Sequence, residues 1–178
     1  MKYIAVFCSV NELEEKYISP AKEFAKLLAE NGYGLIWGGT NKGLMKVIAD
    51  GVQAGGGKII GISMEIIKEH VREDADEMII AKDLGERKTT FLKRCDAMTM
   101  LVGGIGTLDE VMHMLELKKH NLHKKPLVVL NTENFYEGLK VQLQKMKDDG
   151  FITRPLDDYL YFADTPEEAI QYLNKKLA

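Results

Sequence analysis

Short apolar runs alternate with longer amphipathic stretches from one end of the chain to the other. The run Leu127-Val128-Val129-Leu130 is apolar at every position, which is typical of a strand buried on both faces of a sheet. The stretches between the runs have the length and apolar spacing of helices. Strands are predicted at Tyr3–Cys8, Gly34–Trp37, Lys58–Ile62, Glu77–Ala81, Ala97–Val102, Pro126–Asn131 and Tyr159–Phe162. Helices are predicted near 11–30, 43–55, 86–95, 108–120, 134–148 and 166–176.

This alternation predicts an α/β fold: a Rossmann-like, doubly wound, mainly parallel sheet with helices on both faces. No repeat or long linker interrupts the pattern, so residues 1–178 are expected to form a single nucleotide-binding domain. The run Asp164-Thr165-Pro166 supplies a capping residue and a first-turn proline for the last helix. The charged stretch 63–76 fits either a helix or a mobile loop.

A glycine-rich loop joins the strand Ala97–Val102 to a helix that is predicted to begin at about Leu108. Glycines let the backbone approach a ligand closely, and a helix N-terminus offers unpaired N–H groups and partial positive charge. The loop therefore predicts a nucleotide-phosphate site. Its expected contacts are Gly103, Gly104, Gly106 and Thr107. The alternative is a glycine turn that only reverses the chain.

Two known phosphate loops do not fit the chain. The third glycine of the dinucleotide fingerprint is replaced by Asp109. In a second turn, Gly38 and Gly43 have P-loop spacing, but Leu44-Met45 follows where a magnesium nucleotide site needs Lys-Ser or Lys-Thr. ATP hydrolysis is therefore not expected. A small-molecule contact through Gly39, Thr40 and Asn41 remains a prediction.

The helix after the glycine loop carries two apolar stripes. The first is expected to pack on the sheet and consists of Leu108, Val111, Met112 and Leu115. Glu110 falls on roughly the opposite side, together with Met114 and Leu117. Either the same chain covers this second stripe or a second chain does. We favour a homodimer through the helix Leu108–His120, because large apolar patches usually mark interfaces.

Several polar side chains are candidates for chemistry. Glu110 lies beside the predicted phosphate site and is a candidate for acid/base work or charge stabilisation, or it merely complements the helix dipole. Arg87 and Arg94 flank Phe91 on one helix face, where they form either a phosphate and base platform or a solvated basic face. His113, Glu116 and His120 have spacing for a shared metal, but they do not converge on a glycine loop, and no metal site is predicted.

Composition narrows the possible partners. The formal net charge of −3 over 178 residues provides no field that attracts nucleic acid or an anionic membrane. Cys8 and Cys95 belong to no metal-binding or redox motif and read as buried free thiols. With no predicted spanning helix or signal peptide, the protein is expected in the cytoplasm.

With these residues assembled, the chain resembles the LOG (Lonely Guy) family of phosphoribohydrolases over nearly its whole length. The family motif Pro-Gly-Gly-x-Gly-Thr-x-x-Glu is matched by the residues from Val102 to Glu110. Its Arg-Lys pair is matched by Arg87-Lys88, and its second glycine turn by the residues from Gly38 to Met45. Relatives also carry the label "lysine decarboxylase", but no lysine has a context that indicates pyridoxal phosphate, and no cofactor is predicted.

The resemblance implies a homodimeric N-glycosidase-type hydrolase that binds a small-molecule nucleotide. It would cleave AMP or an N6-substituted AMP, a cytokinin precursor, to free base and ribose 5-phosphate. Glu110 and Arg87 would be the catalytic pair, and the Gly-Thr loop and Lys88 would bind the phosphate. Alternatives are a non-catalytic nucleotide-binding or carrier protein, and a purely structural dimer module.

The chain also departs from the family pattern. Val102 replaces the motif proline, Val10 and Asn11 replace two residues after the first strand, and Thr40 replaces a glycine. Leu84-Gly85 precedes the Arg-Lys pair in place of Met-His. The catalytic pair is retained while parts of the substrate cradle change, so the reaction class is better supported than the cytokinin substrate.

Overall fold

The computed structural model describes all residues from Met1 to Ala178. Its centre is one seven-stranded sheet in which every neighbouring pair of strands is parallel. The strand order is β4-β3-β2-β1-β5-β6-β7. The strands are β1 (Tyr3–Phe7), β2 (Gly34–Trp37), β3 (Ile59–Met64), β4 (Glu77–Ala81), β5 (Ala97–Met100), β6 (Leu127–Leu130) and β7 (Tyr161–Ala163). The seven predicted strands are confirmed, with ends that shift by at most two residues.

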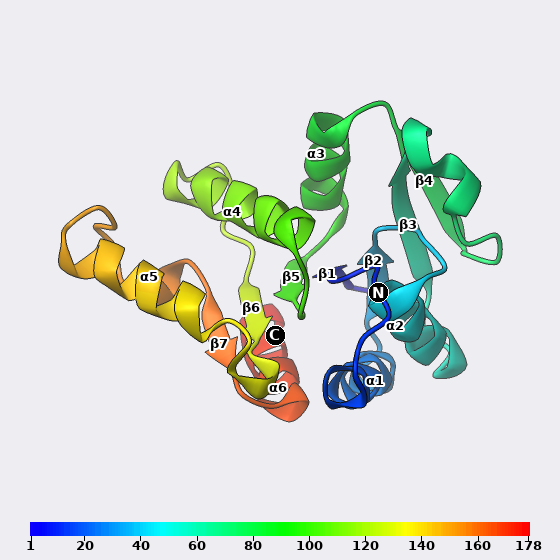
Figure 1. The fold of residues 1–178 in the computed structure, drawn as a ribbon, viewed down its shortest axis with the longest axis horizontal. Coiled ribbons are helices and arrows are strands. Elements are labelled where there is room, and N and C mark those ends of the chain that lie inside the picture. The colour runs from blue at the N-terminus through cyan, green and yellow to red at the C-terminus, as the bar shows by residue number, and fades with distance from the viewer.

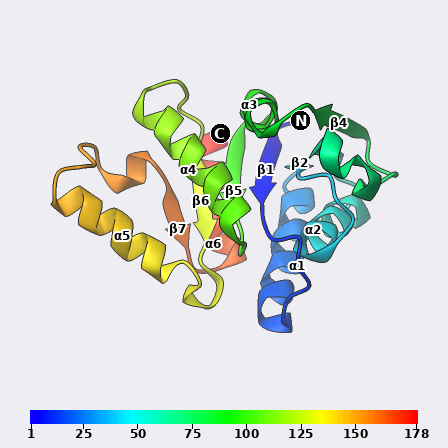
Figure 2. The same ribbon diagram turned by 45° about the horizontal axis from the view of Figure 1, so that its top comes forward.

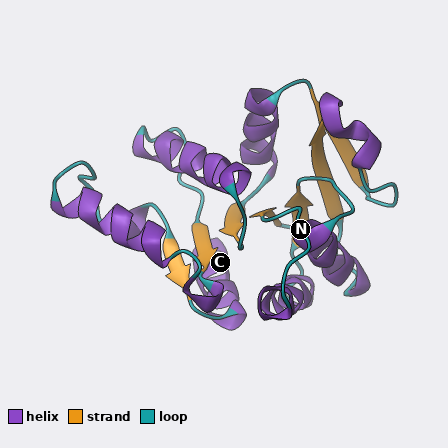
Figure 3. Ribbon diagram, viewed as in Figure 1, coloured by secondary structure: helices purple, strands orange, loops and turns teal.

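Helices cover both faces of this sheet (Figures 1 and 3). One face carries α1 (Glu15–Glu30), α2 (Gly43–Ala54) and α6 (Pro166–Leu177). The other carries α3 (Leu84–Arg94), α4 (Ile105–Lys119) and α5 (Glu137–Asp148). Three short 3-10 helices lie between them: η1 (Glu65–His70), η2 (Thr132–Asn134) and η3 (Leu156–Asp158). The predicted Rossmann-like α/β fold is confirmed.

Two apolar layers explain why β6 is apolar at every position. Side chains alternate along a strand, so Val128 and Leu130 of β6 pack in the layer with α1, α2 and α6. Leu127 and Val129 pack in the layer with α3, α4 and α5. All four are at most 1% exposed. No helix is both long enough and apolar enough to cross a membrane.

The charged stretch 63–76, for which a helix and a loop were both open, contains η1 and then an extended return. Val71 forms an antiparallel bridge with Thr40. Arg72 ties the return to α2, because its Nη2 donates to Gln53 Oε1 over 2.6 Å and its Nη1 donates to Asp50. Since the Arg72 side chain is only 8% exposed, this contact fastens the segment to the body of the protein.

Candidate functional site

The candidate site lies where the winding of the sheet reverses. From β1 the chain proceeds to β2 on one side, whereas β5 pairs with β1 on the other side. Figure 2 shows β1 and β5 side by side at the centre of the sheet. The loops that follow these two strands diverge and leave a crevice at their carboxyl ends, which is the general ligand position in doubly wound folds.

The loop after β5 leads directly into the N-terminus of α4. Gly104 is the N-cap residue, with φ −96°, and no side chain caps the helix. The first amide groups of α4 therefore keep their hydrogen-bonding capacity. No hydrogen bond within the chain uses the hydroxyl of Thr107, whose Oγ1 lies beside Gly103. These groups are the donors that a phosphate requires.

The three glycines of this loop have different reasons to be glycine. A Cβ on Gly103 would lie 2.2 Å from Oγ1 of Thr107, so the packing of the loop itself excludes a side chain there. A Cβ on Gly104 or Gly106 would meet no atom within 4 Å, and neither residue has a positive φ. The chain therefore does not require glycine at these two positions. They leave open space at the helix N-terminus.

Helix α4 buries a different face from the predicted one. It begins at Ile105 rather than near Leu108, and Glu110 is only 6% exposed. The prediction that Glu110 lies opposite the core stripe is wrong. Periodicity counts a carboxylate as polar, but this one has a buried counter-charge and lies on the core face. The buried residues of α4 are Thr107, Glu110, Val111, Met114, Leu115 and Lys118.

The same correction applies to the second apolar stripe. Met114 is 0% exposed within the single chain and belongs to the core cluster under α4. Leu117 is half-buried. Met114 is therefore unavailable to a second chain.

Arg87 of α3 supplies the counter-charge of Glu110. Its Nη1 donates to Oε1 of Glu110 over 2.5 Å, and its Nε donates to the carbonyl oxygen of Ile62 over 2.9 Å. Both side chains of the pair are under 10% exposed. Gly38 allows this approach, because a Cβ there would lie 2.8 Å from Nη2 of Arg87. The guanidinium is held in place by β3, α4 and the turn after β2.

Burial sets the electrostatics of the pair. It raises the pKa of Glu110 above the ordinary value, while the charge and hydrogen bond of Arg87 oppose that rise. A carboxylate held in a water-poor site interacts more strongly with nearby charge than an exposed one does. Perturbed carboxylates in clefts are typical of functional sites.

The surroundings of Arg87 exclude the predicted base platform. Phe91 is 1% exposed and packs edge-to-face on Phe7, with ring centroids 5.1 Å apart. Arg94 forms an ion pair with Glu77 on β4. Phe91 therefore lies beneath Arg87, 5.1 Å from its guanidinium carbon, and is no stacking surface for a base.

A cavity of about 220 Å³ opens between the loop after β1 and the start of α4. Ser9 and Met45, which were not predicted as site residues, contribute to its wall. The Oγ of Ser9 accepts a hydrogen bond from the backbone N of Asn11 over 3.0 Å, which fixes the turn after β1. The strand order indicates that this loop belongs to the site, because β1 and β5 flank the point where the winding of the sheet reverses. The lining residues are Cys8, Ser9, Val10, Asn11, Met45, Arg87, Gly104, Gly106, Thr107 and Glu110.

The remaining predicted contacts lie outside this cavity. Lys88 donates from Nζ to both carboxylate oxygens of Asp109 over 3.0 Å, linking α3 to α4. The Oγ1 of Thr40 donates to the carbonyl oxygen of His70 over 3.1 Å. Asn41 lies beside Arg72 in a separate hollow. Gly39 has φ +79°, a conformation that favours glycine. The second glycine turn thus holds η1 in place.

The histidines of α4 form no cluster. His120 contacts Glu116 over 2.9 Å on the exposed side of the helix, and His113 is half-buried. No group of three or more histidine, cysteine, aspartate or glutamate side chains is arranged to hold a metal ion.

Comparison with known proteins assigns the family. The profile described as "Possible lysine decarboxylase" matches residues 45–173. The Arabidopsis thaliana protein "Cytokinin riboside 5'-monophosphate phosphoribohydrolase LOG5" is 32% identical over 176 residues, which cover 97% of this chain and 77% of the relative. The chain belongs to the LOG family. A Mycobacterium marinum member named "Cytokinin riboside 5'-monophosphate phosphoribohydrolase" is 29% identical and aligns over 94% of this chain and 91% of its own length.

Two solved structures with the same fold are named as molybdenum cofactor proteins rather than phosphoribohydrolases. The molybdenum cofactor binding protein of Rippkaea orientalis superposes with a TM-score of 0.78 at 22% identity, covering 99% of this chain and 98% of its own. The molybdenum cofactor carrier protein of Chlamydomonas reinhardtii gives 0.74 at 23% identity, covering 99% and 98%. At this level of identity the likeness extends to the fold alone.

Only two of this chain's departures from the LOG family pattern lie in the wall of the cavity. Val10 and Asn11 line the cavity, and Val10 is 46% exposed. Leu84 is 52% exposed at the start of α3. Val102, at the position of the motif proline, is 3% exposed and packs in the core. The family's Arg and Glu, by contrast, are present as the buried pair.

Proposed function

We propose that the protein is a nucleoside 5′-monophosphate phosphoribohydrolase. The observation that carries this proposal is the buried Arg87–Glu110 pair beside an open, glycine-lined helix N-terminus. Two LOG-family relatives with about 30% identity are named for this reaction. The substrate class is AMP or an N6-substituted AMP, and the products are the free base and ribose 5-phosphate.

The start of α4 suits the phosphate. Its first amides have no side-chain cap, Gly104 and Gly106 leave open space there, and the hydroxyl of Thr107 is a further donor. Anions at a helix N-terminus are stabilised by these donors and by the helix dipole. Binding energy from a phosphate that does not react helps to position the sugar next to Glu110.

The Glu110 carboxylate suits cleavage of the glycosidic bond. As the bond from C1′ to the base nitrogen breaks, its electron pair leaves with the base and positive charge develops on the ribose ring. Glu110 stabilises that charge and orients a water molecule. The water oxygen bonds to C1′ and its proton ends on the base, so the reaction needs no cofactor. Arg87 holds the carboxylate in position through Nη1.

We further propose that the working unit is a homodimer. The cavity of about 220 Å³ is smaller than the roughly 300–1,000 Å³ that encloses a typical organic ligand. An apolar groove of about 470 Å³ lies next to α4, between it and α5. Met112 of α4 and the 76% exposed Phe151 line this groove. A second copy packed there would shield both the groove and the part of the nucleotide outside the cavity.

The catalytic proposal is tested with a matched pair of variants. Glu110→Gln removes the charge within the site, whereas Glu30→Gln removes the same charge at the exposed end of α1, on the other face of the sheet from α4. With AMP and an N6-substituted AMP as substrates, we expect Glu110→Gln to lose about 10²–10³-fold in kcat. Glu30→Gln should keep the wild-type rate. Full turnover by Glu110→Gln contradicts the mechanism.

The same experiment separates the alternatives. A non-catalytic nucleotide carrier would be stabilised against heat by AMP through mass action, yet release no base. A structural dimer module would show neither response. The shared fold with cofactor carriers makes the first of these outcomes the principal competitor.

A further inference from the structure

A second cavity lies at the opposite end of the sheet from the glycine loops. Its volume is about 310 Å³, enough for about ten water molecules at roughly 30 Å³ each. It is bounded by the last turn of α4, by Pro126 at the amino end of β6, by η3 and by the last turns of α6. Lys118 in its wall is eight residues from Glu110 on the same helix, roughly 12 Å along the axis. The cavity is therefore separate from the proposed catalytic site.

The lining of this cavity is positively charged, whereas the protein as a whole is negatively charged. Four cations line it, Lys118, Lys124, Arg154 and Lys176, against two carboxylates. The chain as a whole has a net charge of −3. None of the four cations forms a salt bridge with any carboxylate of the chain. Four cations against two carboxylates give the cavity a net charge of +2, and none of its cations is held in an ion pair.

Lys118 is the buried member of the group, at 7% exposure. Its Nζ donates to the carbonyl oxygens of Tyr159 and Lys125, over 2.9 and 3.1 Å, which leaves one N–H of the ammonium without a partner. Burial, followed by the charges of Lys176 and Arg154, lowers its pKa to about 8. Buried charges are normally paired, so an anion in the cavity would supply what the chain lacks.

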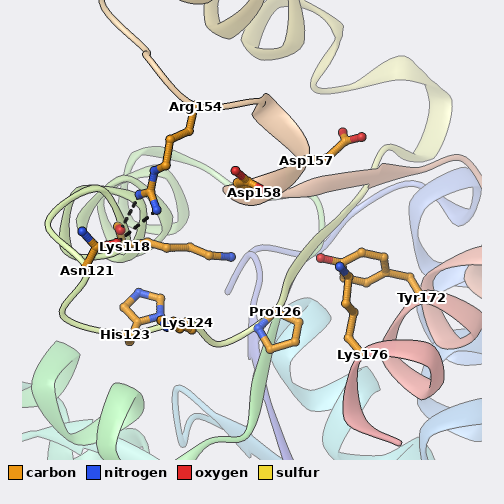
Figure 4. A pocket seen from close by; sticks show the side chains of 10 residues that line it. All are labelled: Lys118, Asn121, His123, Lys124, Pro126, Arg154, Asp157, Asp158, Tyr172 and Lys176. Atoms are coloured by element: carbon orange, nitrogen blue, oxygen red, sulfur yellow. Dashed lines mark hydrogen bonds between the residues drawn. The ribbon is translucent and has the colours of Figure 1, made fainter.

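The side chains converge on one space from different elements (Figure 4). Lys118 of α4 and the hydroxyl of Tyr172 of α6 point toward one another across it. Arg154 donates to Asn121 Oδ1 and to the carbonyl oxygen of Lys118, both uncharged acceptors, and so keeps its full charge at the rim. Asp158 faces the same space from η3. One side of the cavity thus attracts an anion, and the Asp158 side accepts hydrogen bonds.

We propose that this cavity binds a small phosphate ester that also carries hydroxyl groups. Its phosphate lies against the lysine side, with Lys118 and Lys176 as donors. Its hydroxyl groups donate to the carboxylates of Asp157 and Asp158. The site is independent of the proposed hydrolysis, because it shares no lining residue with the glycine-loop cavity.

Binding is tested on the whole protein with inorganic phosphate and glycerol 3-phosphate at constant ionic strength. Amide shifts in a ¹⁵N NMR titration report the location, and calorimetry reports the affinity. We expect shifts at Lys118, in the 121–126 loop and at Lys176. Shifts confined to the glycine loop at 103–107 would overturn the proposal.

Two variants separate a built site from general attraction to positive charge. Lys176→Gln should weaken binding at the cavity roughly tenfold, since it removes a charge-assisted hydrogen bond. Lys175→Gln, the neighbouring exposed lysine outside the cavity, is the matched control and should have no effect. Equal weakening by both variants contradicts a defined site. Both residues are exposed, so neither change threatens the fold.

Asp158→Asn tests whether the ligand donates hydroxyl groups to the carboxylate side of the cavity. It should strengthen the binding of inorganic phosphate, because a like charge is removed. It should also reduce the preference for glycerol 3-phosphate over inorganic phosphate, because a weaker acceptor faces the hydroxyl groups. If this variant weakens inorganic phosphate, or if wild-type protein binds both ligands equally, the assignment of a hydroxyl-bearing ester is wrong.

Discussion

Replacing a glycine with alanine tests whether the fold or a bound ligand requires the absence of a side chain at that position. Gly106 is the second residue of α4, and a Cβ there would meet no atom within 4 Å. Alanine is favoured over glycine in a helix by up to about 1 kcal/mol. Gly106→Ala should therefore raise the Tm by roughly 1–4 °C in a chain of this length. If the open space receives a phosphate, the same methyl group should weaken AMP binding at least about tenfold.

Two other glycines provide the controls. Gly138 is also the second residue of its helix, α5, and its Cβ would also meet nothing within 4 Å. Gly138→Ala should give a similar gain in Tm and leave AMP binding unchanged. Gly103→Ala places a Cβ 2.2 Å from Oγ1 of Thr107 and should cost about 1–3 kcal/mol of stability, as overpacking does.

The assay pairs thermal unfolding followed by circular dichroism with AMP titration by calorimetry. A Gly106→Ala variant that gains stability and keeps wild-type affinity for AMP would refute the assignment of this loop to the phosphate. A Gly103→Ala variant as stable as the wild type would refute the packing argument. The two outcomes are independent of each other.

Three further predictions concern ionisation, reactivity and assembly. Burial raises the pKa of Glu110 above 4.5, the ordinary value for glutamate, so protonation of the active carboxylate should lower kcat/KM already at a pH above 4.5. A pH profile whose acid-side fall occurs only at or below pH 4.5 contradicts this. Burial raises the pKa of Cys95 to about 11 and that of Cys8 further, so Ellman's reagent at pH 8 should modify neither thiol within minutes until denaturant is added; rapid reaction of the folded protein is the opposing result. Phe151→Glu should convert dimers to monomers by light scattering with little change in Tm, whereas an unchanged mass excludes the groove as the interface.

The layered fold could be predicted from the sequence because local patterns determine it. Runs apolar at every position mark strands buried on both faces, and Gly34–Trp37 matches its predicted bounds. The strand order could not be obtained in this way, because pairing between β1 and β5 joins segments about ninety residues apart. For the same reason, only the family resemblance, and no local pattern, connected Val10 and Asn11 of the loop after β1 with the site.

The two charged residues of the site could be named from the sequence, but their arrangement in space could not. Glu110 and Arg87 were paired through the family resemblance, whereas spacing alone placed Glu110 on the wrong face of its helix. Its counter-charge lies on α3, 23 residues earlier, and helical periodicity contains no information about such a partner. Periodicity likewise contains no information about the partners of Lys118, because its buried ammonium donates to carbonyl oxygens from two later segments.

The most direct test of the account is product analysis after incubation of the wild-type protein with AMP and with an N6-substituted AMP. Free base and ribose 5-phosphate are quantified separately by chromatography. We predict that the two products appear in equal amounts and in proportion to enzyme, and that Glu110→Gln forms both about 10²–10³-fold more slowly. Intact nucleotide after prolonged incubation, or base without an equal amount of ribose 5-phosphate, would contradict it.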